Sequence, residues 1–77
     1  MNMKFYVAQD AGVQSLIQWQ YSTGLGDFEH ALWEAICKAD AGNQLRLFKG
    51  FPLHVAAYQN YVGTTGWWQG IKKGLEI

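Results

Sequence analysis

Three residues with reactive side chains share one side of a predicted helix. His30, Glu34 and Cys37 are spaced at i, i+4 and i+7, which brings an imidazole, a carboxylate and a thiol into one stripe. Such groups can ligate zinc or form a Cys–His pair. Helical zinc motifs, however, carry two histidines four residues apart or paired cysteines, and neither spacing occurs here. We interpret the stripe as surface, with His30 paired to Glu34, Glu34 paired to Lys38 and Cys37 half-buried, and expect no metal or other cofactor.

A glycine-rich turn is the second candidate. Gly24-Leu25-Gly26 stands just before a predicted helix, as in loops that bind phosphate through exposed backbone amides. No strand clearly precedes the turn, no Lys-Ser/Thr pair follows it, and the carboxylate of Asp27 would repel a phosphate. We interpret the segment as a turn between two helices. Because no catalytic motif stands out, we expect that the protein is not an enzyme.

Aromatic and basic residues of the second half suit binding better than catalysis. His54, Tyr58 and Tyr61 form a ridge at i, i+4 and i+7, and their apolar bodies with polar tips fit either an interface or the core. Trp67 and Trp68 point about 100° apart on a helix, so we expect one indole to dock inward and the other to lie at the rim. Tryptophan is enriched at binding hot spots, although a small core could use both rings. The candidate partner-binding residues are His54, Tyr58, Tyr61, Trp67, Trp68, Lys72 and Lys73.

The clearest element that could position these side chains is a helix over residues 27–40. Its apolar stripe, at the spacing of a 3.6-residue helix, consists of Phe28, Ala31, Leu32, Ala35, Ile36 and Ala39. Asp27 is the predicted N-cap, and Ala41-Gly42 is the predicted stop. We expect this helix at the centre of the fold, with Glu29, His30, Glu34 and Lys38 on its solvated side.

Four further segments have helical signals. Asp10 is expected to cap a helix that reaches Tyr21; alternation over 13–21 also fits a strand, but the length favours a helix. The connection of about five residues before Asp27 favours antiparallel packing of the two helices. The Asp40-x-x-Asn43 step fits a turn that recaps the chain between two helices. Asn43 begins a shorter unit, with Leu45 and Phe48 facing inward and Leu47 left open as a third inward residue. Helices over 52–62 and 67–75 follow, and the last is weak because Gly70 and Gly74 each cost about 1 kcal/mol.

Length and composition point to one dense domain over residues 1–77. Of its residues, 16% are aromatic and 16% charged, so the chain is neither disordered nor very polar. The formal net charge is zero. The acids outnumber the bases up to Cys37 and the bases outnumber the acids from Lys38 onward, which leaves room for a local basic patch but disfavours binding to nucleic acid through phosphates alone.

These patterns predict an all-α fold, a compact bundle of four or five short helices around the 27–40 helix. Residues 4–8 are expected to form an arm or a first helical turn. A single cysteine excludes an internal disulfide and suits a reducing compartment. We expect no membrane span and no secretion signal, since no apolar run is long enough and Gln9 and Asp10 interrupt the N-terminal one.

The packing and turn residues also resemble a known group of proteins. The resemblance covers about residues 12–69 and rests on Gly26-Asp27-Phe28, Ala31-Leu32-Trp33-Glu34-Ala35-Ile36, Ala39-Asp40, Asn43, Arg46-Leu47, Gly50-Phe51-Pro52, the later Val55, Tyr58 and Tyr61, and Gly66-Trp67-Trp68. It is similar to small, largely uncharacterised proteins encoded by bacteriophages and other mobile elements. The resemblance implies a phage or prophage source and a place in the cytoplasm of the bacterial host.

From these features we expect a small, phage-encoded, non-enzymatic protein that binds a bacterial host or defence protein and modulates its activity, with inhibition as the preferred mode. One alternative is a nucleic-acid-associated accessory protein that uses Arg46, Lys49, Lys72 and Lys73. Another is a structural protein that forms a homodimer through its aromatic ridge.

Overall fold

Five α-helices make up the part of the chain that the computed structural model describes, residues 10–21 and 24–75. They are α2 (Ala11–Tyr21), α3 (Asp27–Lys38), α4 (Ala41–Gly50), α5 (Pro52–Gly63) and α6 (Trp67–Leu75). These residues contain no strand, so the all-α prediction is confirmed. The expected arm at residues 4–8 lies outside the described residues. None of the described helices is long and apolar enough to cross a membrane.

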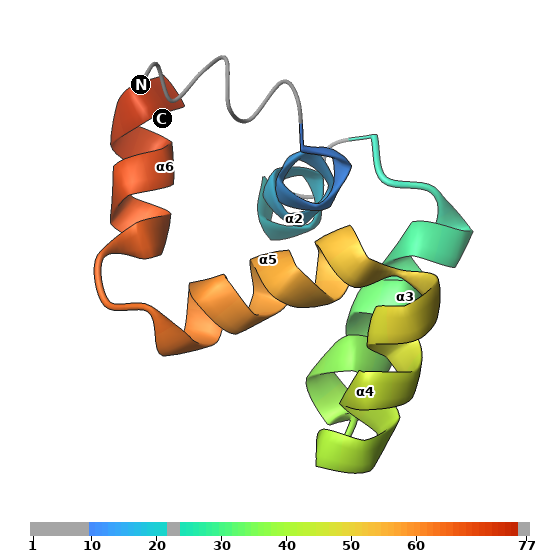
Figure 1. Cartoon of the computed structure of the whole chain (residues 1–77). Helices are drawn as coiled ribbons and strands as arrows, with labels where there is room; N and C mark the ends of the chain where they lie inside the picture. The colour runs from blue at the N-terminus through green and yellow to red at the C-terminus, as the bar shows by residue number, and fades with distance from the viewer. Residues whose placement is uncertain (1–9, 22–23, 76–77) are drawn as a thin grey trace.

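The central position belongs to α5. It runs across the middle of the molecule, with α3 and α4 at one end, α6 at the other and α2 crossing it (Figure 1). Each of the other four helices packs against α5, whereas the 27–40 segment was expected to be central. The reason is that α5 buries residues in several directions: Val55 and Ala57 are buried, and Ala56 and Tyr58 are half-buried.

Several helix ends follow the predicted signals. Asp10 caps α2, with its Oδ1 accepting a hydrogen bond of 3.0 Å from the backbone N–H of Val13. Asp40 caps α4 in the same way, at 2.9 Å from the N–H of Asn43. Pro52 is the first residue of α5, where its missing N–H costs no helical hydrogen bond.

The N-cap predicted for α3 is wrong by one residue. Gly26 occupies the cap without a side-chain hydrogen bond, and Asp27 is the first helical residue. Its carboxylate there still lies near the positive end of the helix dipole. The helix also ends at Lys38 rather than at residue 40, because Asp40 starts the next helix as its cap.

The buried side of α3 is rotated from the predicted stripe. Leu32 and Ile36 are buried as expected, but the third buried residue is Trp33, which is fully enclosed. Phe28 is 64% exposed, and Ala31 and Ala35 are exposed as well. Burial of one indole removes far more apolar surface from water than burial of two alanine methyl groups. The rotation of α3 about its own axis is therefore set by the burial of Trp33.

α2 meets α5 at a contact that only glycine permits. A Cβ on Gly12 would lie 2.9 Å from the backbone nitrogen of His54 and closer still to the carbonyl group of Leu53. The two backbones can approach because no side chain stands between them. α2 is seen end on in Figure 1 while α3 lies across the view, so the predicted antiparallel packing of these two helices is wrong.

The inward side of α4 differs in part from the prediction. Leu45 and Phe48 are 59% and 42% exposed, and they line a hollow that α4 and α5 share. Leu47 instead packs against the core cluster. The apolar residues of α4 lie on two sides of the helix, and the spacing alone does not decide which side is buried. Packing against α5 partly buries the side that carries Leu47.

Candidate functional site

A cluster of polar side chains joins α2, α3 and α5. Oγ of Ser15 donates a hydrogen bond of 2.5 Å to Oε2 of Glu29, within the usual range for a hydroxyl bound to a carboxylate. The indole Nε1 of Trp33 donates to the same Ser15 oxygen at 2.8 Å. His54 completes the cluster, with Nε2 at 2.8 Å from Oε2 of Glu29. Glu29 was expected in the solvated stripe and is instead half-buried.

The order of these groups does not match that of a nucleophilic site. In a catalytic triad the histidine lies between the nucleophile and the acid, so that it can take the proton of the nucleophile. Here the carboxylate lies between Ser15 and His54, and both approach the same oxygen. The Ser15 hydroxyl is buried and already binds Trp33. This geometry is that of a hydrogen-bonded contact that holds three helices together, and it does not fit acyl transfer.

The cluster changes the electrostatics of Glu29. The hydrogen bond from Ser15 is the main cause that lowers the pKa of this carboxyl below its ordinary value, and the contact with His54 acts in the same direction. Partial burial opposes both effects. Glu29 is therefore held as a carboxylate, the form that accepts both hydrogen bonds.

The predicted ridge on α5 divides into two environments. His54 is largely enclosed, between Glu29 and the rings of Trp33 and Phe51, whose centroids are 5.6 and 6.0 Å away. Tyr61 lies toward the other end of the helix, where its hydroxyl donates to Oε1 of Gln20 at 3.2 Å. His54 therefore serves the interior, while Tyr61 adjoins α6.

An aromatic corner forms where α5 meets α6, and we use this name for Tyr61, Val62, Trp67 and Trp68. The rings of Tyr61 and Trp68 are in edge contact, with centroids 5.4 Å apart, and those of Trp67 and Trp68 are 6.5 Å apart. Val62 beside them is 60% exposed. Gly66, with φ +81°, makes the turn that brings α6 to this position.

Both tryptophans of the corner are half-buried, whereas one was expected inside and one at the rim. The reason is Ile71, which follows Trp67 by four residues and Trp68 by three and is fully buried. The inward direction of α6 thus falls between the two indoles, and each covers one side of Ile71. Each ring also keeps a face near the surface.

The basic residues are divided between two ends of the molecule. Lys72 and Lys73 belong to α6, and Arg46 and Lys49 belong to α4, at the opposite end of α5 (Figure 1). Within the described ranges, no lysine or arginine pairs with an aspartate or glutamate. The predicted basic surface is therefore two separate patches.

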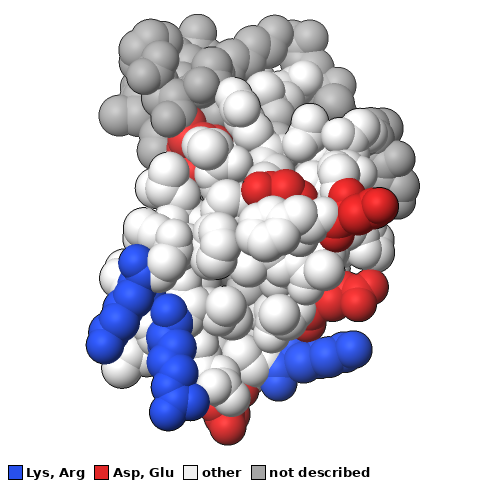
Figure 2. Space-filling model, turned by 90° about the vertical axis from the view of Figure 1, so that its right-hand side faces the viewer, with Lys and Arg blue, Asp and Glu red and all other residues white. Residues whose placement is uncertain are grey.

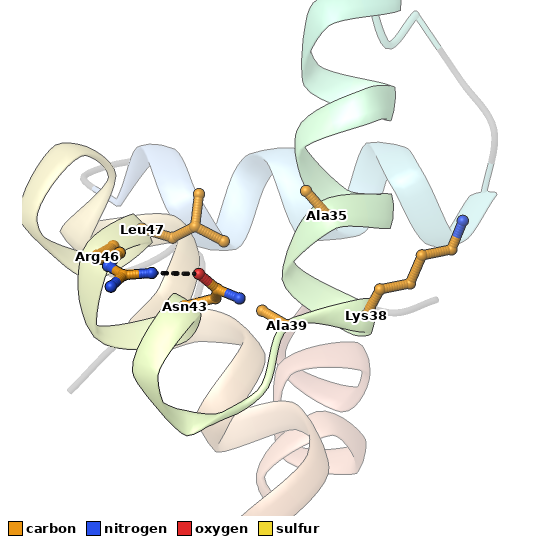
Figure 3. Close-up of a pocket in the computed structure, with 6 residues that line it drawn as sticks. All are labelled: Ala35, Lys38, Ala39, Asn43, Arg46 and Leu47. Atoms are coloured by element: carbon orange, nitrogen blue, oxygen red, sulfur yellow. Dashed lines mark hydrogen bonds between the residues drawn. The ribbon is translucent and has the colours of Figure 1, made fainter.

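A groove lies between α3 and α4, and it was not predicted. Its lining, which we call the basic groove, consists of Ala35, Lys38, Ala39, Asn43, Arg46 and Leu47, around a volume of about 450 Å³. Figure 3 shows Ala35 and Ala39 on one side and Asn43 and Leu47 on the other, with Lys38 extending from the α3 edge. Arg46 donates a hydrogen bond of 3.0 Å from its guanidinium to Oδ1 of Asn43.

The His30, Glu34 and Cys37 stripe is on the surface. Nδ1 of His30 lies 3.4 Å from Oε1 of Glu34, as expected. The expected pair of Glu34 with Lys38 does not form, and Cys37 is exposed rather than half-buried. Partial burial raises the pKa of the Cys37 thiol, and a hydrogen bond with Tyr58 offsets this only in part. Among residues 10–21 and 24–75, no three histidine, cysteine, aspartate or glutamate side chains gather where they could share a metal ion.

Comparison of the chain with models of protein families, with curated proteins and with solved structures finds no match. The function must therefore be argued from the surfaces themselves.

Proposed function

We propose that the protein is a small, non-enzymatic binding module that attaches to another protein through its aromatic corner. The observation that carries the proposal is the contact among Tyr61, Trp67 and Trp68, three large rings held together at one edge of the molecule. Tryptophan and tyrosine dominate the energetics of protein interfaces because each buries a large apolar area while its polar group finds a partner.

When α6 is in place, the rings of the corner are already packed. Trp67 and Trp68 are fixed by their packing on Ile71, and Tyr61 is fixed by its hydrogen bond to Gln20. Rigid rings lose little side-chain entropy when a partner covers them. The adjacent, exposed Val62 extends the apolar area, and Lys72 and Lys73 add positive charge on the same helix.

The partner in this proposal is a bacterial host or defence protein, which the module would inhibit by covering it. This part of the proposal rests on the resemblance to phage-encoded proteins. A nucleic-acid partner has less support, because its four expected contact residues lie in two patches at opposite ends of α5.

The test is capture from a bacterial lysate on the immobilised protein, compared with two variants. Val62→Lys places a charge in the corner, and Phe28→Glu places one at an equally exposed position near the other end of α5. Each charge has the sign that its helix end tolerates. Phe28→Glu also removes the ring contact with Phe51, so capture is compared at a temperature at which circular dichroism shows both variants folded.

We expect one bacterial protein to be retained by the parent chain and by Phe28→Glu and lost with Val62→Lys. Equal retention by both variants would contradict a role for the corner. Sedimentation of the purified protein separates the homodimer alternative, since a dimer that Val62→Lys dissociates would assign the corner to self-association. A salt-sensitive shift of DNA or RNA would favour the nucleic-acid alternative.

A further inference from the structure

The basic groove between α3 and α4 is an open surface that the packing of the five described helices does not fill. α4 packs against α5, and the space between α4 and α3 stays open along a floor of small apolar side chains. Ala35 is exposed, and Ala39 and Leu47 are only half-buried. The volume of about 450 Å³ lies within the range of pockets that bind ligands.

Positive charge stands at both edges of this floor. Lys38 belongs to the α3 edge and Arg46 to the α4 edge, with Lys49 one turn beyond Arg46. Figure 2 shows this face, with blue side chains on both sides of a white area in the lower half of the molecule. None of the three cations pairs with a carboxylate among the described residues.

Neither of the nearby acids forms an ion pair with these cations. Glu34 pairs with His30 on the outer side of α3, and Asp40 holds the N–H of Asn43 as the cap of α4. Arg46 donates only to the neutral amide of Asn43, so its guanidinium can instead donate hydrogen bonds to a carboxylate of a ligand.

We propose that the basic groove binds an acidic, amphipathic helical segment of a partner protein. The floor would receive its apolar side chains, and Lys38 and Arg46 would meet carboxylates on its two flanks. The four-residue spacing of Ala35 and Ala39 leaves α3 without bulky side chains on this side, so that a helix can approach closely. The groove is a separate surface from the aromatic corner, and the proposal does not depend on the corner.

The charge pattern favours an acidic helix over a nucleic acid. Proteins that hold single strands combine cations with aromatic rings on which the bases stack. No aromatic side chain lines the groove, whose residues beside the cations are alanine, leucine and asparagine. A helix with one apolar side and acidic flanks matches both the apolar floor and the cationic edges of the basic groove.

The test uses two synthetic helices of about four turns, with leucine and alanine on one side and glutamate on both flanks in the first. The second has lysine in place of every glutamate. Fluorescence anisotropy of the labelled peptides measures affinity for the whole chain, and amide chemical shifts locate the contact. Arg46→Glu is the variant in the groove. Lys73→Glu is the control, because it makes the same change of charge at an exposed position of α6.

We expect the glutamate helix to bind at least about tenfold more tightly than the lysine helix and to shift amides of residues 35–47. Arg46→Glu should weaken binding about tenfold, and Lys73→Glu should leave it unchanged. Equal affinity for both peptides, or equal losses in both variants, would overturn the proposal.

Two further results would replace the acidic helix with another occupant. Tighter binding of a labelled single-stranded oligonucleotide, with the same dependence on Arg46, would identify a nucleic-acid site. A dimer in sedimentation that Arg46→Glu dissociates would identify a second copy of the chain. Neither result bears on the Val62→Lys experiment, because that variant changes no groove residue.

Discussion

Glu29 in α3 and His54 in α5 are in direct contact, with Oε2 of the carboxylate 2.8 Å from Nε2 of the imidazole. The same oxygen accepts the hydroxyl proton of Ser15 in α2, which in turn binds Trp33. A single carboxylate therefore joins three helices. The side chain that sequence periodicity places on the outside of α3 is the one that ties the bundle together.

Glu29→Gln should lower the free energy of unfolding by about 1 kcal/mol, since hydrogen bonds to a charged acceptor are stronger than those to an amide. Urea unfolding followed by circular dichroism measures the change. Glu34→Gln is the matched control, because it alters an exposed carboxylate of the same helix that pairs with the exposed His30. That control should change stability by less than about 0.5 kcal/mol. Similar losses in both would show that the cluster contributes nothing specific.

The stabilisation by Glu29 should depend on pH. Its pKa in the folded protein is lowered, chiefly by the hydrogen bond from Ser15 and also by His54, so folding favours the carboxylate. The contribution is complete above the ordinary pKa of a glutamate, about 4.3, and is lost as the pH falls through the lower folded value. The stability difference between the parent and Glu29→Gln should therefore shrink below about pH 4.3. A difference that stays constant down to pH 2 would contradict the assignment.

Gly12→Ala should destabilise the protein by about 1–3 kcal/mol, the usual cost of an overpacked contact. The added methyl group would meet the backbone of Leu53 and His54, which cannot move aside as a flexible side chain can. Thermal unfolding gives the measurement. An unchanged melting temperature would mean that α2 can shift away from α5 at little cost.

Gly70→Ala should have the opposite effect and stabilise the protein by about 0.5–1 kcal/mol. Gly70 lies inside α6 with a negative φ, and a Cβ there meets nothing within 4 Å. Alanine would therefore restrict the unfolded chain and favour the helix without a clash. The same thermal assay applies, and a lower melting temperature would contradict the open space at this position.

Cys37 should react slowly despite its exposure. Partial burial raises the pKa of the thiol, so less thiolate, the reactive form, is present near neutral pH. Alkylation by iodoacetamide at pH 7.5 should be slower in the folded protein than in the same protein in urea. The midpoint of the pH–rate profile should lie above that of an unstructured cysteine peptide. Faster alkylation of the folded form would mean that the thiolate is stabilised instead.

Local signals in the sequence were sufficient to predict most of the helices. Asp10 and Asp40 cap them through hydrogen bonds to the third following N–H, and Pro52 opens α5. These interactions span a few residues, so their spacing along the chain carries the information. The class of fold follows from the same patterns.

The buried side of each helix was harder to predict from the sequence than the helix itself. The predicted and observed sides of α3 share Leu32 and Ile36 and differ in whether Phe28 or Trp33 goes inside. A prediction from the spacing of apolar residues places the charged Glu29 on the solvent side of α3. In the structure, Ser15 and His54 from two other helices form hydrogen bonds with its carboxylate, and these contacts between helices leave no signal in the local sequence. The basic groove was missed for a similar reason, since it depends on how α4 docks on α5.

The weak attachment of α6 links recognition to folding. Ile71 is the one fully enclosed side chain within Trp67–Leu75, and Gly70 and Gly74 lower the intrinsic stability of the helix. Local opening of α6 should therefore cost less than global unfolding and would separate the rings of Tyr61 and Trp68. A partner that binds only the assembled corner would shift this equilibrium toward the closed form and slow amide hydrogen exchange throughout α6. Association and ordering of the C-terminal helix would then be governed by one shared equilibrium.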